Sequence, residues 1–143
     1  MKDFVDWPVR LRIASTPAHL PIVRAAVERL ADALGFNETT RDQIALAVDE
    51  ALANIIKHAY EGEPGRPIEI SLHCVGASPE AVALRIELRD WGRQADVAQI
   101  KPRPLDEVRP GGLGVHIMNS IMDEVEYVPA PDGGTRLIMV KAL

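Results

Sequence analysis

The chain has 143 residues, of which 47% are hydrophobic and 26% charged, the composition of one ordinary globular domain with a substantial core. Its 16 basic and 21 acidic residues give a net charge of −5, which argues against non-specific binding to nucleic acid. The single cysteine, Cys74, excludes an internal disulfide and lies on an alternating apolar segment, so a buried structural thiol is expected. The four histidines form no spaced ligand set, which argues against a histidine-based metal site.

Targeting signals are also missing from the sequence. The first residues lack the basic start and apolar run of a signal peptide, and no stretch approaches the roughly 20 apolar residues of a membrane span. We therefore expect a cytoplasmic protein that contacts neither a membrane nor nucleic acid directly.

The first elements in chain order are a strand and a helix. Residues 9–13 alternate apolar and polar side chains, which predicts a half-buried strand. A helix is expected to follow, with Pro21 in its first turn, where the missing N–H costs little. That helix is expected to end at about Leu34, since Gly35 supplies a C-terminal stop.

The second helix carries the most informative pattern of the chain. Thr40 with Gln43 matches a capping box, and the helix is expected to end near Tyr60. Within it, Glu50 and Asn54 are four residues apart, so a carboxylate and a carboxamide share one face. A carboxylate can act as a base, and a carboxamide oxygen suits Mg²⁺. Apolar residues at helical spacing predict a core-facing stripe on the other side: Ile44, Val48, Ala51, Ile55 and Ala59.

The middle of the chain predicts two strands and a long loop. Residues 68–72 and 82–88 alternate strictly, and the loop between them is most simply that of an antiparallel hairpin. Residues 93–110 contain three prolines and only short apolar groups. Long loops of this kind in compact domains are often functional lids.

The last part of the chain completes a layered domain. A helix with an apolar stripe follows the glycines at 111–114, and two final strands are expected near 125–129 and 135–141. Together the elements predict an α+β fold, a two-layer sandwich with a mixed, mostly antiparallel sheet and helices on one face. We expect residues 1–143 to form a single domain.

A short motif, Asp90-Trp91-Gly92, follows the second strand of the hairpin. An aspartate there could accept a hydrogen bond from an exocyclic amine such as adenine N6, and Gly92 would let a planar ring approach the backbone. The same residues are common where strands enter turns, so a structural role is the alternative.

Two glycine motifs follow. The Gly-Gly-Leu-Gly run at 111–114 precedes an amphipathic helix, where backbone N–H groups and the helix dipole favour a triphosphate; the alternative is a hinge with a cap. It is neither a P-loop nor a dinucleotide fingerprint. Gly133-Gly134-Thr135 joins the last strands, either as a plain turn or as backbone support for the glycine loop, with the Thr135 hydroxyl near phosphate.

The order of these motifs resembles the Bergerat-type (GHKL) ATPases, the superfamily of gyrase, histidine kinases and MutL. Within it, the run from Glu50 to Tyr60, Glu-Ala-Leu-Ala-Asn-Ile-Ile-Lys-His-Ala-Tyr, resembles the anti-sigma factor serine kinases of bacteria. The resemblance covers nearly the whole chain, from about Val9 to Lys141.

The resemblance implies ATP and Mg²⁺ as cofactors and a role for each motif residue. It implies that Glu50 is the general base that activates an acceptor serine and that Asn54 binds Mg²⁺. It implies that Asp90 recognises adenine. The remaining matched positions are Gly92 beside that aspartate, Gly111, Gly112 and Gly114 in the phosphate loop, and Thr135 in the final motif.

The resemblance also implies a function and partners. Such kinases phosphorylate an anti-sigma-factor antagonist on serine and bind a sigma factor, usually as homodimers. Many have a second glycine where this chain has Gln94, which affects the expected lid geometry and ATP affinity. Three alternatives stay open: a nucleotide-gated partner-binding module without useful catalysis, a histidine-kinase fragment, for which a preceding phosphoacceptor hairpin would be expected, and a structural domain with chance motifs. The sequence does not indicate which sigma factor, antagonist or response is involved.

Overall fold

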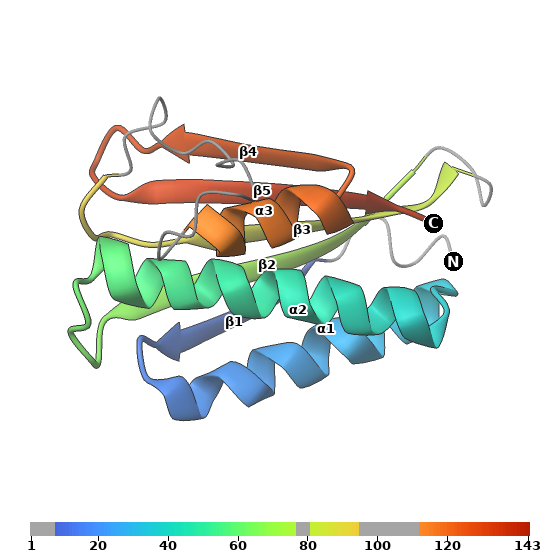
Figure 1. Ribbon diagram of the computed structural model, residues 1–143, viewed down its shortest axis with the longest axis horizontal. Helices are drawn as coiled ribbons and strands as arrows, with labels where there is room; N and C mark the ends of the chain where they lie inside the picture. The colour runs from blue at the N-terminus through green and yellow to red at the C-terminus, as the bar shows by residue number, and fades with distance from the viewer. Residues whose placement is uncertain (1–7, 77–80, 95–111) are drawn as a thin grey trace.

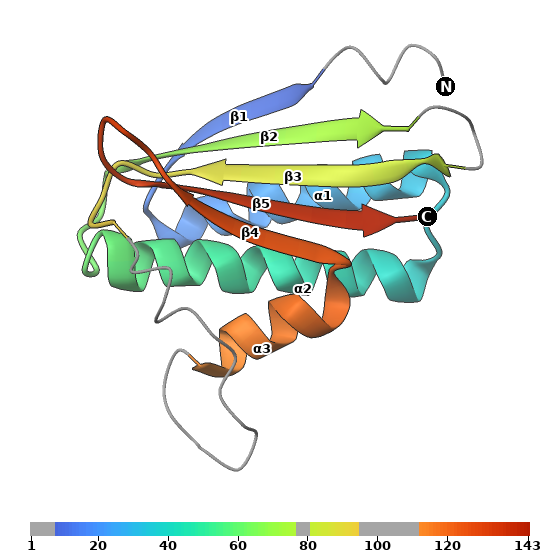
Figure 2. The same cartoon turned by 90° about the horizontal axis from the view of Figure 1, so that it is seen from above.

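The computed structural model describes residues 8–76, 81–94 and 112–143. Three helices cover one face of a five-stranded sheet, as Figures 1 and 2 show, so the predicted two-layer α+β architecture is confirmed. The strand order is β1-β2-β3-β5-β4, and every pairing between the described strands is antiparallel. The strands are β1 (Val9–Ala14), β2 (Pro67–Val75), β3 (Ala83–Arg89), β4 (Glu124–Pro129) and β5 (Thr135–Ala142).

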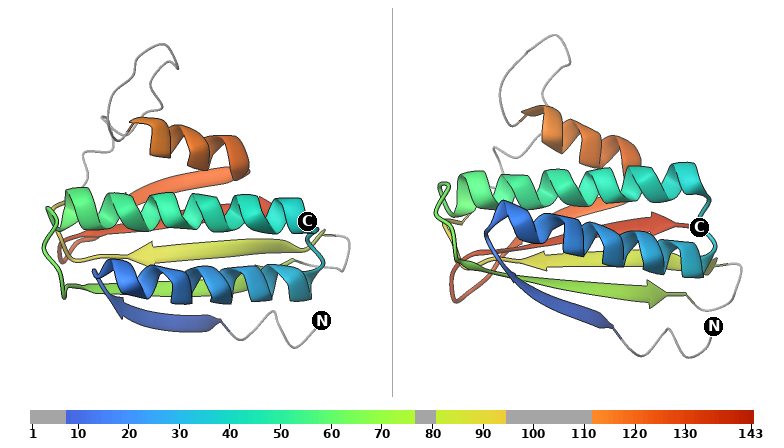
Figure 3. Two further views of the ribbon diagram at one scale, coloured as in Figure 1. Left: turned by 60° about the horizontal axis from the view of Figure 1, so that its bottom comes forward. Right: turned by 90° about the horizontal axis from the view of Figure 1, so that it is seen from below.

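The helices form a single layer in which the second lies between the other two (Figure 3). They are α1 (Leu20–Leu34), α2 (Glu38–Asn54) and α3 (Gly112–Ile121), with a short 3₁₀ turn, η2 (Pro17–His19), and a π-helical turn, η3 (Ile55–Ala59). None of the described helices is long and apolar enough to cross a membrane.

The ends of the first two helices test the capping predictions. α1 stops at Leu34 because Gly35 adopts φ = 101° and returns its N–H to the carbonyls of Ala31 and Asp32, as predicted. The capping box predicted at Thr40 is wrong. Asn37 is the N-cap, because its side-chain oxygen accepts the Thr40 N–H at 2.8 Å. The helix therefore begins three residues earlier than the capping box at Thr40 predicts.

The end of the second helix differs from the prediction in its geometry. The helical path does reach the residue before Tyr60, but after Asn54 it widens into η3. The Tyr60 N–H bonds to the carbonyl of Ile55 at 3.0 Å, five residues back, which is the π-type bond. The extra residue in this turn changes the direction in which Tyr60 leaves the helix.

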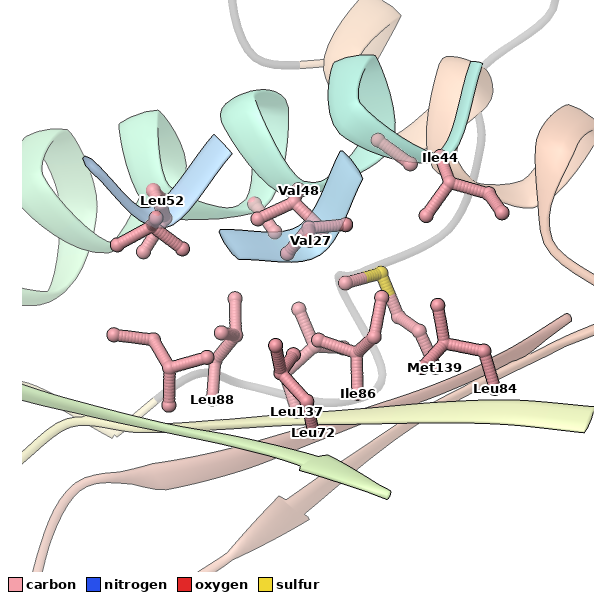
Figure 4. Packing of buried hydrophobic residues seen from close by; sticks show 14 of the residues in the cluster. Val27, Ile44, Val48, Leu52, Leu72, Leu84, Ile86, Leu88, Leu137 and Met139 are labelled. Carbon is pink, nitrogen blue, oxygen red and sulfur yellow. The ribbon is translucent and has the colours of Figure 1, made fainter. Parts of the chain in front are cut away.

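The core lies between the helix layer and the sheet. Ile44, Val48 and Leu52 of α2 point from the helix layer towards strand residues such as Ile86 and Met139 (Figure 4), and all five side chains are fully buried. The predicted apolar stripe of α2 is therefore confirmed. Cys74 is also buried, in agreement with the expected structural thiol, and it forms no disulfide within the described residues.

Candidate functional site

Glu50 and Asn54 lie on the side of α2 that faces the first turn of α3. A Cβ atom added at Gly114 would lie 2.8 Å from Oε2 of Glu50 and 3.6 and 3.7 Å from Nδ2 and Oδ1 of Asn54. Both polar side chains are half-buried, whereas Gly114 is buried. The fold thus brings together three predicted site residues, and the missing side chain at 114 leaves room for the other two.

This cluster combines acceptor oxygens with a helix N-terminus. Gly112 begins α3, so the first turn of that helix, with the positive end of the helix dipole, lies beside the carboxylate of Glu50 and the carboxamide of Asn54. Such an arrangement suits an anion and a cation bound next to each other. Gly111 and most of the predicted lid, residues 95–110, lie outside the described residues.

The donor set fits Mg²⁺ held in part by a nucleotide. Glu50 and Asn54 supply hard oxygen donors, and no group of three or more His, Cys, Asp or Glu side chains arranged for a metal occurs in the described part of the chain. Mg²⁺ is usually bound through one or two protein oxygens together with substrate phosphates and water, so a sparse protein donor set is appropriate.

Asp90 occupies a second, separate part of the site. Its residue is 3% exposed, and its Oδ1 accepts the Gly92 N–H at 3.0 Å. Its own N–H donates to the Thr135 carbonyl at 3.1 Å, which fixes the end of β3 against the start of β5. Burial raises the pKa of the Asp90 carboxyl, although backbone hydrogen bonds from Gly92 and Thr135 and the charge of Arg89 act in the opposite direction.

The Gly133-Gly134 turn lies directly against this aspartate. Gly134 adopts φ = 76°, and a Cβ there would lie 2.0 Å from the Asp90 carbonyl oxygen and 2.7 Å from Cα of Trp91. Two backbones therefore meet with no room for a side chain. In the described residues Gly134 supports the Asp90 segment; its predicted support of the glycine loop, and the approach of the Thr135 hydroxyl to phosphate, stay predictions.

Gly92 is required by packing within the protein, and the predicted approach of a planar ring to its backbone stays a prediction. A Cβ at this position would lie 2.3 Å from the Ala59 carbonyl oxygen and 2.9 Å from Cδ1 of Tyr60. The same carbonyl accepts the Arg93 N–H at 2.8 Å. The space beside Gly92 is thus filled by the end of η3, which ties the Asp90 segment to the helix that carries Glu50.

Two residues of this region were not predicted from the sequence. Arg89 donates to the carbonyls of Asp90 and Gly133 at 2.9 and 2.8 Å, and its guanidinium lies 4.6 Å from the centre of the Trp91 ring. Tyr60 is 3% exposed and bonds to the backbone of Trp91. The position of Tyr60 at the end of the Glu50 motif was the available signal, but its partner Trp91 is 31 residues away in the sequence.

These parts gather at one end of the molecule. The end of α2 with η3, the end of β3, the β4–β5 turn and the start of α3 all lie at the left of Figure 1. The predicted residues Glu50, Asn54 and Gly114 form one cluster there, and Asp90, Gly92 and Gly134 form the other. The hydrogen bonds between η3 and the Asp90 segment connect the two.

Comparison with known proteins identifies the family. The profile of the histidine kinase-like ATPase domain matches residues 13–141. The chain belongs to this family. The resemblance predicted from the ordered motifs is thereby confirmed.

Relatives of this ATPase-domain protein include the serine-protein kinase RsbW of Bacillus pumilus, 27% identical over 151 residues, which spans 100% of this chain and 90% of the relative. RsbW of Bacillus subtilis is 27% identical over 128 residues. This alignment covers 87% of this chain and 79% of the relative.

Two solved structures share the fold. The RsbU and RsbW domains of Rv1364c from Mycobacterium tuberculosis align with a TM-score of 0.65 at 16% identity, over 94% of this chain and 32% of that one. The blue-light activated histidine kinase of Erythrobacter litoralis aligns with a TM-score of 0.57 at 19% identity. This alignment covers 88% of this chain and 41% of the kinase chain. The chain spans about a third of the mycobacterial chain and under half of the second.

Proposed function

We propose that this protein is an ATP- and Mg²⁺-dependent protein-serine kinase that acts as an anti-sigma factor. It phosphorylates an anti-sigma-factor antagonist and sequesters a sigma factor, and it works as a cytoplasmic homodimer. The observation that carries the proposal is the contact of Gly114 with Glu50 and Asn54, which gathers a base, a cation ligand and a helix N-terminus at one point. The relatives named serine-protein kinase RsbW support the same activity.

The proposed chemistry needs positioning and charge neutralisation more than covalent help from the protein. Bound Mg²⁺ would neutralise charge on the phosphates, with Asn54 as its protein ligand. Glu50, one helical turn away, would accept the proton of the acceptor serine hydroxyl. The backbone N–H groups at Gly111, Gly112 and Gly114 would stabilise negative charge on the phosphates.

The base of ATP would be bound at the other cluster. Asp90 would accept a hydrogen bond from the adenine amine, and Gly92 and Gly134 keep its backbone in place through close contacts with neighbouring segments. Thr135, buried at the start of β5, would complete this side of the site. On this proposal the Glu50 and Asn54 cluster would bind the phosphate end of one nucleotide, and the Asp90 cluster would bind its base.

A nucleotide-gated binding module without useful catalysis is the second candidate. Gln94, which stands where many relatives of this kind have glycine, donates its side-chain amide to the Ala130 carbonyl at 2.7 Å. This bond ties the second residue of the predicted lid to the β4–β5 turn. A restricted lid would favour binding over turnover.

Calorimetry with ATP tests the nucleotide site. The wild-type protein is expected to bind ATP only weakly without Mg²⁺, and Asn54→Ala should weaken the Mg²⁺-dependent binding. Asp42→Asn is the matched control, because Asp42 is an exposed carboxylate on the same helix. Absence of binding at millimolar ATP would contradict the proposal.

Phosphate transfer to a serine of a candidate antagonist protein separates the two candidate functions. Glu50→Ala should retain ATP binding and lose transfer by at least about 100-fold. If regulation of the partners survives in Glu50→Ala, the binding module is the better description.

A further inference from the structure

Tyr60 lies between the two clusters of the candidate site and has no role in the proposed chemistry. It is the first residue after η3, and its side chain is buried against the Asp90 segment. Gly92 packs against the edge of its ring, as the 2.9 Å separation between a Cβ at Gly92 and Cδ1 of Tyr60 shows.

The phenol hydroxyl of Tyr60 connects two other segments of backbone. It donates to the carbonyl of Pro67 at 2.5 Å, at the start of β2, and accepts the N–H of Trp91 at 2.9 Å, in the middle of the Asp90 motif. One hydroxyl can make both bonds at once, since it has one proton and two lone pairs. Burial raises the pKa of Tyr60, so the hydroxyl keeps the proton that it donates.

The π-helical turn is what directs Tyr60 to this position. The bond from the Tyr60 N–H to the Ile55 carbonyl spans one residue more than an α-helical bond. The turn begins directly after Asn54, so the distortion separates the cation ligand of α2 from the residue that contacts Trp91. π-type turns of this kind often occur at functional sites.

We propose that Tyr60 is a positioning residue that fixes the base-binding aspartate Asp90 relative to the Glu50 and Asn54 face of α2. Through Trp91 it holds the two ends of the nucleotide site as one rigid unit. The inference rests on the proposed function, because it assigns the base of ATP to Asp90.

Tyr60→Phe is the variant that tests this role. Phenylalanine keeps the ring against Gly92 and beneath Arg66, whose guanidinium lies 4.6 Å from the ring centre, and removes only the hydroxyl. The part-buried N–H of Trp91 and the carbonyl of Pro67 then lose their shared partner, which lets the Asp90 segment shift. The contacts of Gly92 and Arg93 with Ala59 remain, so the expected loss is partial.

The measurement compares two ligands on the wild type and the variant. ATP contains the base, whereas inorganic tripolyphosphate contains only the phosphate chain. With Mg²⁺ present, Tyr60→Phe is expected to raise the Kd for ATP about tenfold and to leave the Kd for tripolyphosphate unchanged. In the kinase reaction, KM for ATP should rise while kcat at saturating ATP stays within about twofold.

Two further variants guard against a purely structural effect. Tyr127→Phe also removes a phenol hydroxyl, from the half-buried Tyr127 of β4, and should leave both Kd values unchanged. Replacement of Tyr60 by 4-aminophenylalanine restores the donor to Pro67 and a weaker acceptor for the Trp91 N–H, so it should recover part of the ATP affinity. If Tyr60→Phe folds poorly, recovery of ATP affinity in the 4-aminophenylalanine variant still tests the role of the hydroxyl.

The possible outcomes separate this inference from the proposed function. If the wild type binds ATP and Tyr60→Phe binds it equally well, only the positioning role is overturned. Equal weakening of ATP and tripolyphosphate overturns it too, because the effect is then general. If the wild type binds no ATP at all, the proposed function fails and the role of Tyr60 fails with it.

Discussion

Replacement of Gly114 by alanine should separate stability from activity. The new Cβ would lie 2.8 Å from Oε2 of Glu50, so that carboxylate must retreat by about 0.6 Å to reach an ordinary contact of 3.4 Å. The obstructing atom is the far end of a flexible side chain, which can rotate without moving the backbone. The cost therefore falls on the position of the proposed base.

The two effects on stability nearly cancel. Alanine in place of glycine within a helix stabilises by up to about 1 kcal/mol. A strained rotamer at Glu50 costs about 0.5 to 1.5 kcal/mol. We expect the free energy of unfolding of Gly114→Ala to lie within about 1 kcal/mol of wild type, with a Tm within about 5 °C.

The effect on catalysis is expected to be much larger. A displacement approaching 1 Å at the reacting centre can reduce the rate about 100-fold, so kcat for transfer to the partner serine should fall about 10- to 100-fold. Thermal unfolding and a phosphate-transfer assay on the same preparation measure both quantities. Gly62→Ala is the control. Gly62 has φ = 80°, and a Cβ added there would meet no other segment within 4 Å, so this variant should lose about 1 kcal/mol of stability through backbone strain and no activity.

Two results would refute this reasoning. A loss of more than about 3 kcal/mol of stability would mean that Glu50 cannot move and that the cluster is a rigid part of the core. An unchanged kcat would mean that Gly114 does not lie beside the reacting groups in the working enzyme.

Three further predictions concern the neighbouring parts of the structure. Gly134→Ala places a Cβ 2.0 Å from the Asp90 carbonyl oxygen at φ = 76°, so it should lower the free energy of unfolding, measured by urea denaturation, by about 3 kcal/mol or more. A free energy of unfolding equal to that of wild type would contradict this close approach. Asn37→Ala removes the acceptor for the Thr40 N–H, so it should lower the free energy of unfolding by about 1 kcal/mol in the same assay and leave ATP affinity unchanged. A change in ATP affinity would contradict a role limited to capping the helix. Burial raises the pKa of Asp90, so the folded chain binds more protons, and the stability that Asp90 contributes is present below its unfolded pKa and lost as pH rises through its folded pKa. Asp90→Asn should therefore gain Tm relative to wild type as the pH rises above the unfolded pKa of Asp90, and it should lose ATP binding. A Tm difference independent of pH would refute this.

Much of the fold was predictable from local patterns. The strands came from alternation of apolar residues, and the core stripe of α2 came from the helical spacing of Ile44, Val48 and Ala51. The end of α1 followed from Gly35. Each of these signals works because it depends on residues within one or two turns or along one strand.

The boundaries were less predictable where two local signals compete. Asn37 and Thr40 both carry a side chain that can cap a helix, and the sequence favoured Thr40 because Gln43 completed a capping box. The structure begins the helix after Asn37 instead, since that residue is already in an extended conformation and its oxygen reaches the Thr40 N–H. The π-helical turn after Asn54 had no recognisable signal.

The sequence by itself determined which side chains are candidates for the chemistry: Glu50 and Asn54 on one helix face, an aspartate at the end of a strand and glycines before a helix. Only the tertiary structure decided why Gly92, Gly134 and Tyr60 are needed, because each of them contacts a segment that lies about 30 to 45 residues away along the chain. A close approach of two backbones leaves no periodic pattern in either segment. Such contacts are fixed by how helix and sheet pack together, which is why the link between the two halves of the site became visible only in the folded chain.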